Sequence, residues 1–155
     1  MYRGSSGLLQ KNHLIHEEAV KIFLSETCQK LKCSPDREVS QKDIEAILEV
    51  KSKLANHYKS ISFTKGTDQP RSISPTDALL SKIMLGTLGC IPAYDRYFII
   101  GFKQEKISRS FSHKSFTQLF EFIDIHSNDI KAAQELILSQ TKTHYPIMKI
   151  VGMYF

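Results

Sequence analysis

The sequence predicts a single all-α domain, and three observations lead to this fold class. The chain has 155 residues, of which 41% are hydrophobic, so it is long and apolar enough for one packed core. Apolar residues recur at helical spacing along most of the chain, without strand-like alternation or internal repeats. The segment 77–101 holds only four charged residues, so we expect a compact domain of six or seven helices around a central apolar helix within it.

The N-terminal part of the chain predicts a tail followed by a helix. Residues 1–12 contain glycine and serine, and we expect them to form a flexible N-terminus ahead of a single domain over 13–155. Over 13–32 the apolar residues have the spacing of one amphipathic helix, with Val20 and Leu24 on its apolar face.

A second helix is predicted to begin at Ser40, whose hydroxyl suits a helix cap, with Asp43 in the first turn. It carries Glu49 and Lys53 one helical turn apart, which predicts an exposed ion pair. The polar segment 63–74 then breaks the helical pattern, and we expect a loop there.

The strongest local signal is Ser74-Pro75-Thr76-Asp77, which predicts a helix over 75–85. Ser74 suits the cap, Pro75 the first helical position, and Asp77 the third, where a carboxylate faces the positive helix end. This helix has almost no polar face and is therefore expected to be the central one. Further helices are predicted over 92–102, over 115–125 with Ser115 as its cap, from Ser127 or Asn128 onward, and from Pro146 to the end of the chain.

The chain is basic, with a formal net charge of +5, and the excess charge is unevenly distributed. The segments 59–71 and 101–115 carry net charges of +2 and +3, which together account for the whole excess. A polyanion would be held there, so nucleic acid is the expected partner, with DNA favoured over RNA. The expected phosphate contacts are Lys65, Arg71, Arg96, Lys103, Lys106, Arg109 and Lys114.

Within 102–116, basic residues alternate with Phe102, Phe111 and Phe116. This combination fits nucleic-acid contact, since lysine, arginine and serine suit phosphates and exposed aromatic rings stack on bases. The alternative is a solvated linker whose phenylalanines anchor it to the core. The sequence favours neither interpretation over the other.

Two charged residues within 77–101 are candidates for chemistry. Asp95 suits either a helix-start carboxylate that accepts backbone N–H bonds, or a catalytic carboxylate at the mouth of a cleft. Lys82 suits either a lysine whose stem covers the core while its head reaches water, or a desolvated catalytic lysine that attacks a substrate or pairs with a carboxylate. We expect Tyr94 and Tyr97 to line the pocket beside Asp95.

From Thr76-Asp-Ala-Leu-Leu-Ser-Lys-Ile-Met-Leu to Ile91-Pro-Ala-Tyr-Asp-Arg-Tyr, the chain resembles the helix-hairpin-helix DNA glycosylases. The resemblance implies an all-helical fold in which Asp95 is the catalytic carboxylate of a Pro-Val-Asp-type motif. In bifunctional members a lysine nineteen residues earlier is the nucleophile; that position is Thr76 here, so the resemblance implies a monofunctional, water-using N-glycosidic hydrolase, or a degenerate relative. The family's glycine-rich hairpin has no counterpart in 71–75, which contains no glycine.

Other chemistries leave no signature in the sequence. There is no P-loop, dinucleotide fingerprint, serine-hydrolase elbow or kinase motif, so no cofactor is expected. His13, His16 and Glu17 lack a third ligand at a helpful spacing, and no metal is assigned. The three cysteines match no zinc pattern and are interpreted as buried free thiols. No apolar run would cross a bilayer or serve as a signal peptide, so we expect a soluble, cytoplasmic protein without membrane contact.

A second functional hypothesis is a non-catalytic interaction module of a bacterial regulatory system, such as a toxin–antitoxin or phage-related pair. The apolar C-terminal segment 147–155 would then bind a protein partner or form a homodimer. Salt-dependent nucleic-acid binding would favour the first hypothesis, and a dimer that is lost on deletion of 147–155 would favour the second.

Overall fold

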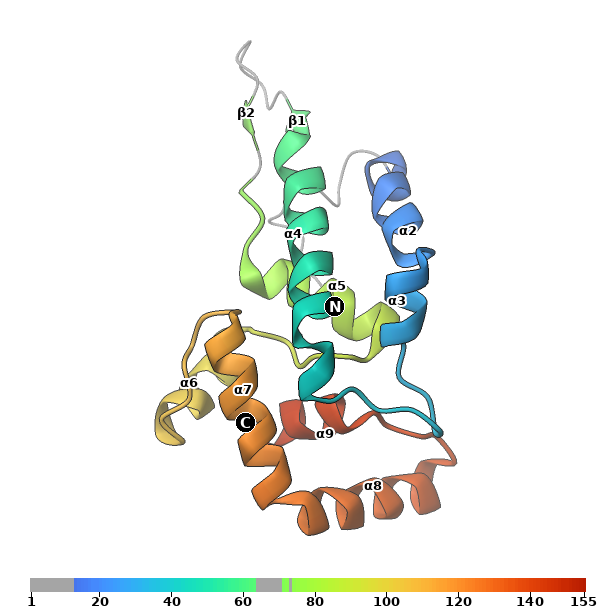
Figure 1. Cartoon of the computed structure of the whole chain (residues 1–155), viewed down its shortest axis with the longest axis vertical. Helices are drawn as coiled ribbons and strands as arrows, with labels where there is room; N and C mark the ends of the chain where they lie inside the picture. The colour runs from blue at the N-terminus through green and yellow to red at the C-terminus, as the bar shows by residue number, and fades with distance from the viewer. Residues whose placement is uncertain (1–12, 64–70, 73) are drawn as a thin grey trace.

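Helices make up most of the computed structural model, which describes residues 13–63, 71–72 and 74–155 (Figure 1). The all-α prediction is confirmed, since the β-structure in those ranges is limited to one pair of two-residue strands and an isolated bridge between Ser34 and Arg37. The expected flexible N-terminus, 1–12, lies outside the described residues. No helix in the described part of the chain is long and apolar enough to span a membrane.

The described residues contain eight α-helices, one more than the upper number expected, because the first predicted helix is split in two. In chain order the elements are η1 (His13–His16), α2 (Glu17–Phe23), α3 (Glu26–Leu31), η2 (Gln41–Asp43), α4 (Ile44–Ser60), β1 (Ser62–Phe63), β2 (Arg71–Ser72), α5 (Asp77–Leu88), α6 (Arg96–Gln104), α7 (His113–Ile125), α8 (Ser127–Thr141) and α9 (Ile147–Tyr154); η1 and η2 are 3₁₀ turns.

The prediction of one helix over 13–32 is wrong, because the chain turns between α2 and α3. The Ser25 hydroxyl accepts a hydrogen bond from the Cys28 amide and caps a new helix, α3. A serine in this position offers the backbone an alternative to continuing the first helix. Leu24, just before the new cap, is consequently 70% exposed, and Val20 is exposed as well.

Local predictions for the second helix are confirmed. Ser40 precedes η2, which leads directly into α4, and the Ser40 amide donates to the Asp43 carboxylate at 2.9 Å. Glu49 and Lys53 form the expected exposed ion pair, with 2.6 Å between Lys53 Nζ and Glu49 Oε1. These contacts depend only on residues within one turn of each other, which is why the sequence predicts them.

α4 packs against four other helices, α2, α3, α5 and α7 (Figure 1). The helix predicted over 75–85 is α5, which packs against α3 and α4. Several large side chains of α5, among them Leu79, Ile83 and Leu85, are only half-buried. The apolar face of α5 thus borders open space as well as the core. The fully buried side chains of α4 are Ile44, Ile47, Val50, Leu54 and Tyr58.

Three helices begin a few residues away from their predicted starts. Thr76 caps α5 in place of Ser74, since its hydroxyl accepts a bond from the third amide of the helix at 3.2 Å. Asp95 caps α6, which therefore begins later than predicted. Ser112 precedes α7 at the position expected for Ser115. The starts of α5 and α7 each offer two side chains able to cap, Ser74 or Thr76 and Ser112 or Ser115, whereas α6 begins at the first residue that can cap it, Asp95.

The connection between α4 and α5 contains the strand pair. β1 and β2 run antiparallel, with Ser62 opposite Ser72. The loop expected over 63–74 begins and ends in this pair, and its residues 64–70 and 73 lie outside those described. The pair lies at the end of the long axis opposite α8, well away from α6 (Figure 1).

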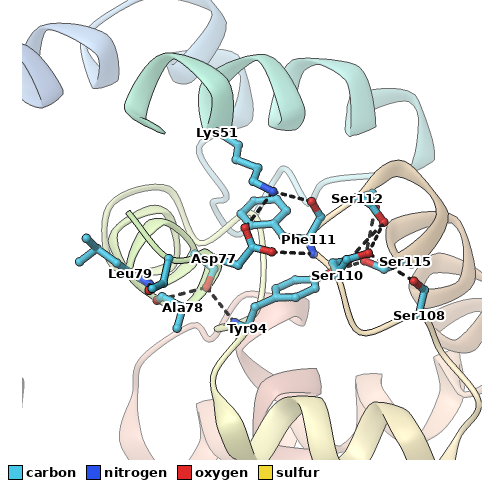
Figure 2. Close-up of polar contacts among 12 residues, drawn as sticks. Lys51, Asp77, Ala78, Leu79, Tyr94, Ser108, Ser110, Phe111, Ser112 and Ser115 are labelled. Carbon is cyan, nitrogen blue, oxygen red and sulfur yellow. Dashed lines mark hydrogen bonds and ion pairs between the residues drawn. The ribbon is translucent and has the colours of Figure 1, made fainter. Parts of the chain in front are cut away.

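A polar network holds the connection between α6 and α7 against the centre of the molecule (Figure 2). Lys51 of α4 pairs with Asp77 at the start of α5, with 2.9 Å between Nζ and Oδ1, and also donates to the Phe111 carbonyl at 2.6 Å. The other Asp77 oxygen accepts the Phe111 amide proton at 3.1 Å. Three segments far apart in the sequence therefore meet at a single ion pair.

Tyr94 lies in an aromatic cluster next to this network and is only 1% exposed. Its ring stacks on Phe111 with centroids 5.0 Å apart, and its hydroxyl shares a 2.6 Å hydrogen bond with Ser115. Burial raises the pKa of Tyr94 despite that bond. Tyr94 completes the core, which contradicts the expectation that it lines a pocket.

The segment 102–116 is anchored by its phenylalanines. Phe102, Phe111 and Phe116 are all buried. The three rings therefore anchor the segment to the core and do not stack on bases, while contact of its cations with phosphates stays a prediction. The lysines and arginine between them remain exposed.

The C-terminal helix is partly buried, with Met148, Ile150 and Val151 in the core. α9 begins after Pro146, as predicted, and packs against α8. Met153 and Tyr154 remain exposed, at 63% each. Phe155 lies against Gly101 of α6, where a Cβ would come within 2.6 Å of the phenylalanine ring. The end of the chain is thus held by a close approach that a glycine permits.

Candidate functional site

Asp95 lies at the N-terminus of α6, where three neighbours hold its carboxylate. One oxygen accepts hydrogen bonds from the amides of Tyr97 and Phe98, at 3.2 and 3.3 Å. The other oxygen forms a 3.0 Å ion pair with Nζ of Lys82 on α5. The sequence left open whether Lys82 and Asp95 share a site, and the structure brings them together.

These neighbours keep Asp95 ionised. Partial burial acts to raise the pKa of the carboxyl, but the Lys82 bond and the two backbone N–H bonds outweigh it and lower the pKa. Asp95 is therefore a helix cap and a charged group at once, with 30% of its side chain exposed. Lys82 pairs with this carboxylate while 39% of its side chain stays exposed, so it is a lysine whose head reaches water and not a desolvated one.

Asp95 borders a hollow of about 240 Å³ between α5, α6 and α9. Tyr97, expected as a pocket residue, lines this hollow and is 76% exposed. The rest of the lining is mostly apolar, with one ammonium group from Lys149. The lining residues are Leu85, Ala93, Asp95, Tyr97, Phe98, Lys149, Gly152, Met153 and Phe155.

A second hollow, of about 450 Å³, adjoins the first and shares Leu85 and Lys149 with it. We refer to it as the cationic hollow, because Lys32, Lys82 and Lys149 line it and no carboxylate belongs to its lining. The ion pair between Lys82 and Asp95 links the two hollows, since each partner lines a different one.

The exposed side of α6 is cationic and continues into the connection to α7. Arg96, Ile100 and Lys103 follow one another at helical spacing and are exposed, as is Tyr97. We refer to residues 96–114 as the basic segment. Its exposed cations are Arg96, Lys103, Lys106, Arg109 and Lys114.

The cations of the basic segment differ from many others in the protein by their lack of partners. None of the five forms an ion pair with another described residue, and Glu105 is the single carboxylate within the segment. Their charge is therefore available to an external anion. The cations paired with carboxylates elsewhere are Lys21, Lys30, Arg37, Lys51, Lys53 and Lys82.

Two expected phosphate contacts fall outside this surface. Lys65 lies outside the described residues, and for Arg71 only the backbone, in β2, is described. β2 is far from α6 along the long axis of the molecule (Figure 1). The remaining expected contacts are those of the basic segment.

Sequence reasoning missed two lysines of the cationic hollow, Lys32 and Lys149. Lys149 lines both hollows, and its Nζ lies 3.7 Å from the centroid of the Tyr145 ring. A lone lysine inside the apolar segment 147–155 was a usable signal, of the same kind as Lys82 in its apolar helix. Lys32 gave no comparable signal, because it stands among other polar residues.

The described residues offer little for metal or thiol chemistry. No group of three or more His, Cys, Asp or Glu side chains in that part of the chain is placed to hold a metal ion. Cys28, Cys33 and Cys90 are free, as the sequence predicts. Cys33 lines the cationic hollow, but burial and the nearby Glu38 carboxylate raise the pKa of its thiol to about 12. Cys33 is thus a neutral thiol at physiological pH rather than a nucleophile.

Comparison with known proteins leaves the function to be argued from this geometry. No family model, curated protein or solved structure matches this chain. The resemblance of residues 76–97 to helix-hairpin-helix DNA glycosylases therefore stays a hypothesis. In the structure α4 and α5 are joined through the strand pair, where that family has a glycine-rich hairpin.

Proposed function

We propose that this protein binds nucleic acid, DNA in preference to RNA, through the basic segment 96–114. The observation that carries the proposal is the presence there of five exposed cations that form no ion pair with another described residue. Phosphate oxygens would supply the missing partners, and release of their counterions would drive binding. The connection that carries Lys106 and Arg109 is held by the Lys51–Asp77–Phe111 network, so these cations start from a fixed backbone.

Tyr97 and Ile100 supply apolar contact between the cations of α6. Both side chains are exposed, and the exposed fraction of Tyr97 is larger than that of Ile100. An exposed tyrosine ring gives a surface on which a base can stack whatever its identity. We therefore expect an unpaired or extruded base to lie at Tyr97, beside the hollow that Asp95 borders.

Asp95 gives this surface a candidate catalytic group. Its lowered pKa keeps it charged, which suits stabilisation of positive charge on a sugar better than proton abstraction. The proposed reaction is hydrolysis of an N-glycosidic bond, in which water adds to the sugar carbon as the base leaves. Lys82 would position Asp95 rather than attack the sugar. A degenerate relative would keep the same surface and lack only this step.

Binding of labelled duplex DNA, single-stranded DNA and a structured RNA, followed by fluorescence anisotropy at low and physiological salt, tests the proposal. We expect about micromolar or tighter binding at low salt that weakens steeply as salt rises. Duplex or single-stranded DNA should bind more tightly than the RNA. Absence of binding to all three nucleic acids at low salt would overturn the proposal.

A second candidate function is assembly with another copy of this chain. Met153 and Tyr154 are exposed beside an apolar hollow of about 280 Å³ between α7, α8 and α9, and Ile125 and Leu136 are exposed on the neighbouring helices. Contiguous apolar exposure is typical of an interface. In this case light scattering would give a dimer for the wild-type protein and a monomer when Met153 and Tyr154 are replaced by serine. A monomeric wild-type protein would exclude this function.

A further inference from the structure

The cationic hollow is a second place where positive charge gathers, and its lysines lie outside the basic segment. It lies between the end of α3, the C-terminal half of α5 and the start of α9, and measures about 450 Å³. Lys32, Lys82 and Lys149 reach it from these three elements. Because the elements are far apart in the sequence, the fold itself brings the three lysine side chains to the border of one hollow.

Glycines leave room at this hollow. At Gly86 a Cβ would meet nothing within 4 Å, so no neighbouring atom fills the space beside it. Gly89 has a positive φ of 69°, which ends α5 and sets its backbone against Pro146. The hollow is thus bordered by bare backbone as well as by lysine side chains.

Two of the three ammonium groups have no carboxylate partner among the described residues. Lys32 forms no ion pair there, and Lys149 instead lies over the Tyr145 ring, which holds a cation without neutralising it. Lys82 pairs with Asp95, which does not line this hollow. Like charges around one space repel each other, and an anion of more than one charge relieves that repulsion.

The C-terminus of α5 accounts for only part of this charge. Lysines near the last turn of a helix are favoured by its negative end. The Cys33 amide, however, already donates to the Leu88 carbonyl at 2.8 Å. The Gly89 amide lies within hydrogen-bond distance of the Met84 and Leu85 carbonyls. These bonds already satisfy carbonyl groups at the end of α5. Interaction with the negative end of the helix therefore does not account for all three lysines.

We propose that the cationic hollow is a phosphate-binding site, filled by the phosphate of a free nucleotide or of a nucleic-acid strand. Lysine ammonium groups act as point charges that suit phosphate oxygens, and a doubly charged phosphate balances more than one of them. The adjoining apolar hollow with the exposed Tyr97 would take the base attached to that phosphate. The site is separate from the basic segment and does not depend on it.

Lys82 connects this site to Asp95. A phosphate in the cationic hollow would compete with Asp95 for the Lys82 ammonium group, since the ion pair links the two hollows. Removal of the Asp95 charge should therefore strengthen phosphate binding, whereas removal of a lysine should weaken it. A general effect of net charge would give the same two signs, so comparison with equal charge changes placed elsewhere on the protein distinguishes a defined site from it.

Titration of the ¹⁵N-labelled wild-type protein with inorganic pyrophosphate at low salt locates the site without any substitution. We expect saturable shifts of the backbone amide signals of Cys33, Gly86, Thr87 and Gly89, with little change on α8. Absence of saturable shifts, or shifts spread evenly over all exposed lysines, would overturn the proposal.

Matched variants then test the lysines. Replacing Lys32 and Lys149 by glutamine should weaken pyrophosphate binding about tenfold or more, since each lost contact is a charge-assisted one. Replacing the exposed Lys42 and Lys131 removes the same charge elsewhere and should change it less than about twofold. Asp95→Asn should strengthen it about two- to fivefold. Equal weakening in the two double variants would contradict a defined site.

Competition experiments identify the source of the phosphate. A nucleoside monophosphate that displaces pyrophosphate assigns the site to free nucleotides, and an unphosphorylated oligonucleotide that displaces it assigns the site to the strand backbone. Failure of both to compete would overturn the ligand class. Replacement of Lys103, Lys106 and Arg109 by glutamine should leave pyrophosphate binding unchanged, so the proposed function and the phosphate site can fail separately.

Discussion

Asp95 combines a structural role and a proposed chemical role in one carboxylate. It accepts two amide protons at the start of α6 and pairs with Lys82. Asparagine caps helices about as well as aspartate, so Asp95→Asn keeps the first role and removes the charge. This substitution therefore separates the cap from the chemistry.

We expect Asp95→Asn to abolish any release of bases from damaged DNA while DNA stays bound with an affinity within about fivefold of the wild type. Cleavage of the strand at the resulting abasic sites measures base release, and Asp124→Asn, at an exposed carboxylate of α7, is the control. A fully active Asp95→Asn variant would remove Asp95 from the mechanism. A wild-type protein without base release on any substrate would be a binding protein alone.

His16 connects the N-terminal 3₁₀ turn to α4. Its Nδ1 lies 3.0 Å from the Tyr58 hydroxyl. Burial, followed by the charge of the neighbouring His57, lowers the pKa of His16. Since the unfolded chain then binds a proton more readily than the folded one, protonation of His16 favours unfolding.

The free energy of unfolding should therefore decrease as the pH falls from the ordinary histidine pKa of 6.5 to the lowered value in the folded protein. Above that window the contribution of His16 is fully present, and below it no further loss occurs. Chemical denaturation at about pH 7.5 and about pH 5 measures the effect. The His16→Gln variant should lose less stability on acidification than the wild type; an equal loss would contradict this role.

At the scale of elements, the connection between α6 and α7 is positioned by Lys51. We expect Lys51→Met to lower the free energy of unfolding by about 1–2 kcal/mol, because Asp77 and the Phe111 carbonyl lose their shared partner while the apolar stem is kept. Lys53→Met on the same helix removes only the exposed pair with Glu49 and should cost less than about 0.5 kcal/mol. Equal effects in urea denaturation would show that the network adds nothing.

Replacement by alanine should have opposite effects on stability at two helical glycines. Gly86 of α5 has open space where a Cβ would lie, so Gly86→Ala should stabilise the protein by about 0.5–1 kcal/mol. A Cβ added at Gly101 of α6 would lie 2.6 Å from the Phe155 ring. Gly101→Ala should therefore destabilise the protein by about 1–3 kcal/mol, because Phe155 is displaced. Stabilisation by both substitutions would mean that Phe155 does not pack on α6.

Local signals predicted which segments are helical, because helical periodicity and capping depend on neighbours within a few residues. They did not fix where helices begin when two suitable side chains lie within one turn. Ser115, for example, forms a buried hydrogen bond with Tyr94, and Ser112 is the residue that precedes α7. Hydropathy reports how apolar α5 is and not what covers it, so it did not predict that Leu79, Ile83 and Leu85 stay half-buried.

At the scale of the whole molecule, charge shows the same division between local and tertiary information. The positive excess of residues 101–115 could be counted in the sequence. The pairs of Lys21 with Glu17 and of Lys30 with Glu26 are local, since the partners lie four residues apart on one helix. That the cations of the basic segment stay without ion-pair partners among the described residues depends on the fold. The meeting of Lys32, Lys82 and Lys149 at one hollow is likewise tertiary, and no spacing in the sequence predicts it.

The salt dependence of DNA affinity in matched charge variants tests nucleic-acid binding through the basic segment most directly. Replacing Lys103, Lys106 and Arg109 by glutamine should reduce the slope of log affinity against log salt by about three. A control variant that removes three exposed lysines elsewhere should keep the wild-type slope. An unchanged slope in the first variant would contradict the claim that this segment contacts the phosphates. The control lysines are Lys42, Lys131 and Lys142.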